Sequence, residues 1–160
     1  MAEPPPLHPD IEHLKFLLGT WTGTGEGSYP TIEPFTFNEV ATYGHVGKPF
    51  VAYSQRTKHA LTGEPLHAEH GYFRPVGTDA VEFVVVQPSG IVEIHHGTVD
   101  GKRIAMQAST VLTTPTAKDV ASVQRELEVS GQQMNWTIAM GAVGQEHQHH
   151  LQANLRRTPT

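Results

Sequence analysis

The chain has 160 residues, of which 38% are hydrophobic, and 11 basic against 16 acidic side chains give a formal net charge of -5. This length suits one domain with a substantial core, and the acidic balance disfavours nucleic acid as a partner. The sequence has no cysteine, which excludes a disulfide framework, a thiolate nucleophile and cysteine-ligated metal. Without a signal-peptide pattern or an apolar run of membrane-spanning length, we expect a cytoplasmic protein with no membrane partner. Eleven histidines are the one compositional excess and point to metal or proton chemistry.

The N-terminal segment is a proline-rich tail followed by a short helical pattern. Residues 1–10 include three consecutive prolines, so we expect a flexible tail before a single domain over residues 11–160. Asp10 is a suitable N-cap and Gly19 a suitable C-terminal cap. The apolar stripe between them is Ile11, Leu14, Leu17 and Leu18. One helix before a run of strands predicts a plug at the open end of a barrel.

Glycine recurs at every second position within the stretch from Gly19 to Pro30. If this stretch is a strand, one of its faces carries Gly19, Trp21, Gly23, Gly25 and Gly27. That face would present one indole ring and then a surface without side chains. Two explanations fit equally: a sharp bend at a barrel corner, or a strand that runs beside a bulky ligand.

Short alternating segments separated by turn residues fill the rest of the chain. The expected strands cover residues 35–43, 50–57, 66–74, 81–87, 91–99, 103–112, 120–129 and 134–140. Asp100-Gly101 is a strong hairpin dipeptide, and no long crossover separates consecutive strands. The pattern predicts an all-β fold: an antiparallel up-and-down β-barrel of about ten strands, similar to lipocalins and fatty-acid-binding proteins, with a short N-terminal helix and room for a small ligand.

The segment 144–157 holds three histidines in four positions, His147, His149 and His150. As a strand, it would place His149 with Leu151 on the inner face and His150 outside. As a helical turn from His149 onward, it would pair Leu151 with Leu155 and end in Arg156 and Arg157. The two interpretations select different histidines. A neutral imidazole in an apolar cavity is a good ligand for haem iron, whereas the spacing alone favours solvent-exposed histidines.

Three further polar residues fall where a cavity wall is expected. His67 alternates with His70 along one strand, Gln87 ends another, and Lys118 lies in a loop. Each also has an ordinary explanation: His67 can face solvent, Gln87 can be a strand-end polar residue rather than a donor to the cavity, and Lys118 can be a solvated lysine rather than the partner of a ligand carboxylate. No nucleophile and base order, phosphate loop or paired-carboxylate spacing is present.

The stretch Gly19-Thr-Trp21-Thr-Gly23-Thr-Gly25-Glu-Gly27 resembles the GxWxGxGxG signature of the nitrobindins, a family of small haem-binding β-barrels. The similarity continues through Tyr29-Pro30-Thr31, Gly47-Lys48-Pro49-Phe50, Leu66-His67-Ala68-Glu69, Gln87-Pro-Ser-Gly90, Thr116-Ala-Lys118 and His150-Leu151, so it covers nearly the whole chain. This resemblance implies a ten-stranded barrel with one haem b per subunit at one mouth, often as a homodimer.

The resemblance also implies which residues contact the haem. The family's axial histidine is followed by leucine, which implies His150 as the ligand of the iron, with His149 as the alternative, and favours the helical-turn interpretation of the tail. The other implied contacts are Thr31, Leu66, His67, Gln87 and Lys118. Among these, Lys118 would pair with a haem propionate, and Leu66 and His67 match positions on the distal side.

The activity implied by the resemblance is isomerisation of peroxynitrite to nitrate on ferric haem, with nitric oxide binding to the ferrous form. No side chain other than the iron ligand is implied in the chemistry. Two alternatives stay open: a nitric oxide sensor or carrier without turnover, and a haem-free lipocalin-like carrier. In the haem interpretation the glycine-rich strand leaves space at the pocket mouth, so Gly25→Val is expected to impair haem uptake more than folding.

Overall fold

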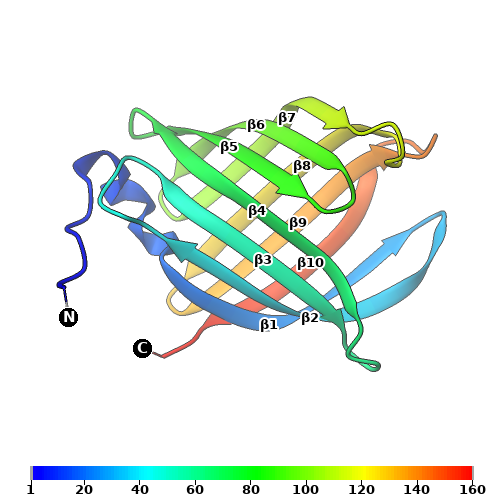
Figure 1. The fold of residues 1–160 in the computed structure, drawn as a ribbon, viewed down its shortest axis with the longest axis horizontal. Helices are drawn as coiled ribbons and strands as arrows, with labels where there is room; N and C mark the ends of the chain where they lie inside the picture. Colours follow the sequence, from blue (N-terminus) through cyan, green and yellow to red (C-terminus); the bar gives the residue numbers. More distant parts are fainter. Residues whose placement is uncertain (1, 160) are drawn as a thin grey trace.

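Ten β-strands form the body of the molecule, which is described over residues 2–159 by a computed structural model (Figure 1). The strands are β1 Gly19–Tyr29, β2 Ile32–Gly44, β3 Val51–His59, β4 Pro65–Val76, β5 Ala80–Gln87, β6 Ile91–Asp100, β7 Arg103–Thr113, β8 Val120–Ser130, β9 Gln133–Ala142 and β10 Gln148–Arg157. The glycine-rich stretch forms β1, the histidine-rich tail forms β10, and the eight expected strands between them are all present.

The strands pair in chain order as antiparallel neighbours, and β1 pairs with β10 to close the barrel. The predicted up-and-down barrel of ten strands is confirmed. Because consecutive strands are joined as hairpins, the β1–β2, β3–β4, β5–β6, β7–β8 and β9–β10 connections all lie at one end of the barrel. Within residues 2–159, no helix has the length and apolar character needed to cross a membrane.

The N-terminal helix is a 3-10 helix, η1, over Pro9–Leu17. The expected cap at Asp10 is wrong, because the His8 Nδ1 atom accepts the Asp10 backbone N–H at 3.1 Å. Pro9 occupies the first turn, where a missing N–H breaks no helical hydrogen bond. The helix ends at Leu18 in an extended conformation, so Gly19, with a φ of 126°, begins β1 instead of capping the helix.

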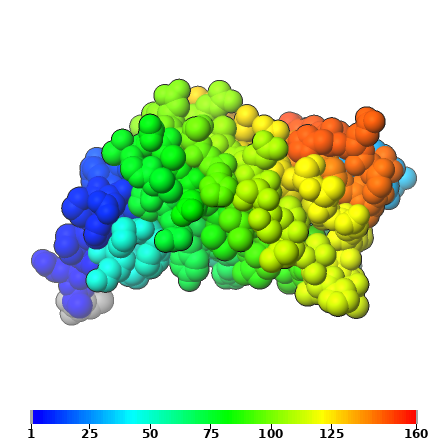
Figure 2. Space-filling view, turned by 90° about the horizontal axis from the view of Figure 1, so that it is seen from above, coloured from blue at the N-terminus to red at the C-terminus, as the bar shows by residue number. Residues whose placement is uncertain are grey.

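Helix η1 closes the end of the barrel that lies away from the β1–β2 hairpin (Figure 1). Ile11, Leu14 and Leu17 are fully buried in the same core as Trp21. The Trp21 Nε1–H donates to the Leu17 carbonyl oxygen at 2.8 Å, which fixes the helix to the first strand. Figure 2 shows the N-terminal segment at one end of the molecule and the β7–β8 and β9–β10 connections together at the other. The expected plug is confirmed, and the second end is left for a ligand.

Aromatic rings and the neighbouring strand cover the glycine-rich face of β1. A Cβ atom at Gly25 would lie 2.3 Å from Phe37 Cζ and 2.5 Å from the Gln152 backbone oxygen, and one at Gly27 would lie 2.5 Å from Phe35 Cζ. The expectation of an open surface at the pocket mouth is therefore wrong. Close approach inside the barrel wall explains these glycines.

Candidate functional site

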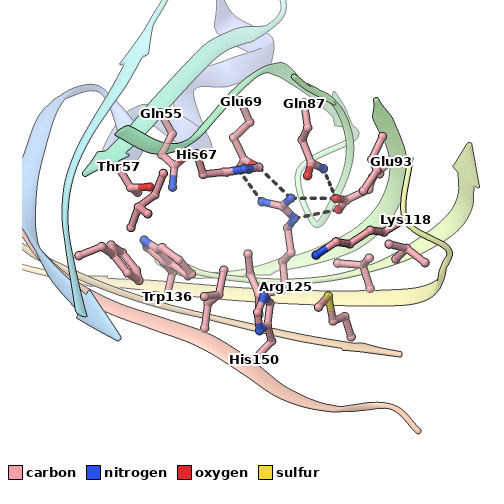
Figure 3. A pocket seen from close by; sticks show the side chains of 18 of the residues that line it. Gln55, Thr57, His67, Glu69, Gln87, Glu93, Lys118, Arg125, Trp136 and His150 are labelled. Carbon is pink, nitrogen blue, oxygen red and sulfur yellow. Dashed lines mark hydrogen bonds and ion pairs between the residues drawn. The ribbon is translucent and has the colours of Figure 1, made fainter. Parts of the chain in front are cut away.

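A cavity of about 520 Å³ occupies the end of the barrel opposite η1 (Figure 3). This volume is typical of small-molecule and cofactor sites. Its apolar lining is Ile32, Phe35, Phe37, Leu66, Ile91, Val120, Val123, Trp136, Ile138, Met140 and Leu151. Its polar lining is Gln55, Thr57, His59, His67, Glu69, Gln87, Glu93, Lys118, Arg125 and His150.

A β-bulge in β10 directs His150 into this cavity. His149 pairs with Ala139 and Leu151 pairs with Ile138, so His150 is an extra residue without an opposite partner in β9. A bulge changes the direction of the side chains around it, and here His150 and Leu151 both line the cavity. His149 is exposed on the outside of the barrel. The helical-turn interpretation of the tail is wrong, and so is the regular-strand expectation that His149 faces inward.

The His150 imidazole is held by a backbone carbonyl of β1. Its Nδ1 lies 3.1 Å from the Ser28 oxygen, next to a second irregularity in the strand pairing between Gly27 and Tyr29. An Nδ1–H donated to this carbonyl leaves the Nε2 lone pair on the other edge of the ring available to a metal. The Tyr29 ring packs edge-on against the imidazole, with the ring centroids 5.2 Å apart.

The surroundings of His150 favour its neutral form. Burial lowers the pKa of His150, and the nearby His149 and His67 rings act in the same direction, although the Ser28 carbonyl acts against them. A neutral imidazole is the form that coordinates iron. The structure therefore presents a metal-binding form of this side chain at neutral pH.

Four of the other expected contacts line the cavity: Leu66, His67, Gln87 and Lys118. Thr31 instead lies in an adjoining hollow that shares His67, Gln87, Lys118 and His150 with the cavity. The glycines and Trp21 of the β1 signature line neither space. The structure thus brings the expected contacts to one end of the barrel. The signature residues are part of the barrel wall and do not line the cavity.

A cluster of ionised side chains crosses the barrel at the cavity floor (Figure 3). The Arg125 Nη1 and Nη2 groups donate to the two carboxylate oxygens of Glu69 at 2.7 and 3.1 Å. Its Nε and Nη2 groups donate to the two oxygens of Glu93 at 3.1 Å each. The Tyr53 O–H also donates to Glu69 at 2.7 Å, and the His95 Nε2 lies 2.7 Å from Glu93.

Charge pairing keeps both carboxylates of this cluster ionised. Burial is the largest effect and would raise their pKa. The Arg125 guanidinium and the hydrogen bonds from Arg125 and from His67 or His95 together outweigh burial, and they hold the pKa of Glu69 and Glu93 well below the ordinary value. Burial lowers the pKa of His95 despite its hydrogen bond to Glu93. The cluster is therefore two carboxylates around one guanidinium, all hydrogen-bonded.

Glu39 is a third buried carboxyl group, and no cation among residues 2–159 pairs with it directly. The Gln55 Nε2–H donates to its Oε1 at 2.5 Å, and the Trp136 Nε1–H donates to its Oε2 at 2.7 Å. Burial raises the pKa of Glu39 to about 7, although these two hydrogen bonds act in the opposite direction. This group therefore changes charge near neutral pH, unlike Glu69 and Glu93.

The sequence interpretation did not single out Arg125, Glu69 or Glu93 as functional residues. A signal was present, because Arg125 shares a strand face with Val123 and Leu127, both of which are buried. A charged residue on a buried face requires an opposite charge within reach. The alternation predicts that such a partner exists, but only the barrel closure shows that it comes from β4 and β6.

The donor set at the cavity mouth fits a haem. One neutral imidazole directs a nitrogen inward, apolar side chains form the walls, and the Lys118 ammonium at the rim suits a carboxylate group. Over residues 2–159, no group of three or more His, Cys, Asp or Glu side chains could hold a bare metal ion. Haem iron needs only one protein ligand, so this site has enough ligands for haem but too few for an isolated metal ion.

Comparisons with known families agree with this geometry. A family described as "THAP4-like, heme-binding beta-barrel domain" matches residues 10–157. Peroxynitrite isomerase 2 of Mycobacterium avium (strain 104) is 49% identical over 158 residues, covering 96% of this chain and 98% of the relative. The peroxynitrite isomerase of Nocardia farcinica is 44% identical over 164 residues and covers 98% of both chains.

Solved structures show the same barrel. The crystal structure of Rv2717c from M. tuberculosis superposes with a TM-score of 0.91 at 42% identity, over 96% of this chain and all of that one (100%). A phycobiliprotein lyase from Guillardia theta superposes with a TM-score of 0.66 at 6% identity, over 93% of this chain and 92% of that one, which shows a shared fold alone.

Proposed function

Because the chain belongs to the nitrobindin family of haem-binding β-barrels, we propose that it is a haem-dependent peroxynitrite isomerase whose iron is held by His150. Relatives of nearly the same length carry the name peroxynitrite isomerase, and the identity extends over almost the whole chain. Peroxynitrite and nitrate contain the same atoms, so the conversion needs no external electron donor.

The observation that carries this proposal is the state of His150. The bulge directs its ring into the cavity, the Ser28 carbonyl fixes Nδ1, and burial keeps the imidazole neutral. Only a neutral ring with a fixed tautomer offers a lone pair in a constant direction. His149 does not meet this need, since it lies exposed on the outer surface and away from the cavity.

The remaining cavity residues bind, orient and exclude water. Phe35, Phe37, Ile138 and Leu151 provide an apolar surface for a flat macrocycle. Lys118 at the rim pairs with a carboxylate at the mouth, and Thr31 contacts the part of the group outside the barrel. Ferric haem held by these residues would supply a Lewis-acidic iron.

Several finer features belong to the same proposal. We expect haem b, one per chain, within a single domain over residues 11–160 that follows a tail over residues 1–10. Of that tail, Pro9 and Asp10 lie in η1, and residues 1 and 160 lie outside the described part of the chain. Nitric oxide would bind the ferrous form at the same position, and the homodimer and the cytoplasmic location stay predictions.

The test is reconstitution of purified protein with haem, followed by Soret absorption and by peroxynitrite decay in stopped flow. Wild type should give a stable ferric spectrum and should accelerate formation of nitrate beyond free haem. His150→Ala should lose both properties, because it removes the imidazole that is proposed to hold the iron.

His149→Ala is the matched control, since it removes a neighbouring imidazole from the outer face. It should keep the spectrum and the rate. Loss of the ferric spectrum in His149→Ala alone would contradict the ligand assignment. A normal spectrum without acceleration of peroxynitrite decay would contradict isomerase activity and favour a sensor or carrier.

A further inference from the structure

Nitrogen donors that reach into the barrel are directed at three buried carboxyl groups. Two of these donors, Gln87 and Gln55, are amides, and each of them keeps a carbonyl oxygen that the carboxyl group does not use. The donors on Glu69 come from Arg125 and His67, those on Glu93 from Arg125, Gln87 and His95, and those on Glu39 from Gln55 and Trp136.

The orientation of the Gln87 amide follows from its neighbour. Its Nε2 donates to a carboxylate oxygen of Glu93, and Arg125 holds that carboxylate in place from the other side. The reverse orientation would direct a carbonyl oxygen at a carboxylate, which is repulsive. The Gln87 Oε1 atom therefore points away from Glu93, as Figure 3 shows.

Gln55 repeats the arrangement deeper in the barrel. Its Nε2–H donates to Glu39, and its buried Oε1 has no hydrogen-bond partner among residues 2–159. The side chain is 7% exposed and lines the same cavity. A buried carbonyl oxygen without a partner is costly, so a donor in the cavity would be stabilised there.

The Gln87 oxygen lies across the barrel from the proposed iron ligand. In the closed order of strands, β5 is five strands from β10 in either direction, so Gln87 at the end of β5 faces the wall that carries His150. Both residues line the cavity and its outer mouth. A ligand held in the cavity would lie between the two walls.

We propose that Gln87, on the wall across from His150, and Gln55, deeper in the barrel, form a hydrogen-bond acceptor surface through their carbonyl oxygens. This surface favours iron ligands that carry an N–H or O–H group to donate, which for peroxynitrite means its protonated form. Glu93 and Glu39 act as positioning residues, because each holds the amide nitrogen and so turns the oxygen toward the cavity. This inference rests on the proposed haem at His150.

The first measurement is the C–O stretching frequency of the ferrous protein with carbon monoxide. A lone pair near the bound ligand raises this frequency, whereas an N–H donor lowers it. Wild type should therefore absorb at a higher frequency than Gln87→Leu. Gln152→Leu is the matched control, because Gln152 also donates its amide nitrogen to a glutamate, Glu26, but on the outer surface. It should leave the frequency unchanged.

The second measurement is the affinity of the ferric protein for imidazole and for 1-methylimidazole, which has no N–H to donate. The preference for imidazole should fall by about 2- to 12-fold in Gln87→Leu, the range expected for one hydrogen bond. Glu93→Gln should also reduce it, since the new amide lets Gln87 rotate. If the Glu93 variant does not fold, the Gln87→Leu result is sufficient to test the proposal.

The outcomes separate this inference from the proposed function. If haem addition gives no Soret band, both are overturned. If the haem protein forms but Gln87→Leu changes neither the stretching frequency nor the ligand preference, the acceptor surface alone is overturned. A higher frequency in Gln87→Leu than in wild type would show a donor at this wall and would also overturn it.

Discussion

Replacing Gly25 tests whether the glycines of β1 serve barrel closure or the pocket. Gly25→Ala would place a Cβ atom 2.3 Å from Phe37 Cζ and 2.5 Å from the backbone oxygen of Gln152. Phe37 is buried and stacks on Trp136 at a centroid distance of 6.2 Å, so its ring has little room to move. The backbone oxygen belongs to β10, which pairs with β1 along this segment.

Because of these two contacts, we expect Gly25→Ala to lower the free energy of unfolding by about 3 kcal/mol, the upper end of the range for overpacked cores. For a domain of this size, such a loss lowers the melting temperature by about 6–12 °C. Gly25→Val should be worse, because it adds two methyl groups at the same place. The sequence analysis expects Gly25→Val to impair haem uptake more than folding. The structure predicts the reverse: folding is impaired directly, and haem uptake falls as a consequence.

The assay is urea unfolding of the haem-free protein, with Gly44→Ala as the matched control. A Cβ atom at Gly44 meets nothing within 4 Å, although this residue also lies in a strand. Gly44→Ala should change the free energy of unfolding by no more than about 0.5 kcal/mol. If Gly25→Ala is as stable as Gly44→Ala yet binds haem poorly, the closure argument is refuted.

Arg125→Met should lower the free energy of unfolding by about 3–5 kcal/mol, because two buried carboxylates lose their shared cation; a loss below about 1 kcal/mol in urea titration would contradict this. The pKa values of Glu69 and Glu93 in the folded protein lie below the ordinary 4.5, so their contribution to the free energy of unfolding is present above pH 4.5. This contribution is lost as the pH falls toward the folded pKa values, and urea titrations from pH 6 to 3 would show the loss. The raised pKa of Glu39, about 7, has the opposite effect on stability, because unfolding releases a proton between pH 4.5 and 7. The free energy of unfolding should therefore fall by about 3 kcal/mol as the pH rises through that window. Glu39→Gln should remove this dependence of stability on pH. Lys118→Ala should weaken haem affinity by about 2- to 5-fold at low salt and less at high salt, and an equal loss at both would exclude ion pairing.

Most of the fold follows from local patterns in the sequence. Two-residue alternation and turn residues such as Asp100-Gly101 predict each strand, and short connections leave only an up-and-down order. The cap of η1 could not be predicted in this way. His8 and Asp10 are both able to cap a helix, and the choice depends on Pro9, which fixes where the first turn begins.

The candidate site is only partly predictable for the same physical reason. Strand alternation fails at His150 because the bulge depends on how β10 pairs with β9, and the residues of β10 alone carry no sign of it. The family resemblance selected the histidine that faces the cavity, although it favoured a helical turn that is absent. The contacts among Arg125, Glu69 and Glu93 join three strands that are far apart in the chain, so they depend on closure of the barrel.

The extra residue in β10 means that segment length, as much as residue identity, decides whether this barrel can bind a metal. Deleting one residue before Leu151 would restore regular pairing with Ile138 and turn the preceding histidine to the outside, although the His-Leu dipeptide would remain in the sequence. Conversely, inserting one residue into the last strand of a haem-free barrel could direct an outer histidine inward. Gain and loss of the cofactor among such barrels can thus proceed by single-codon insertion and deletion, without any substitution in the strand.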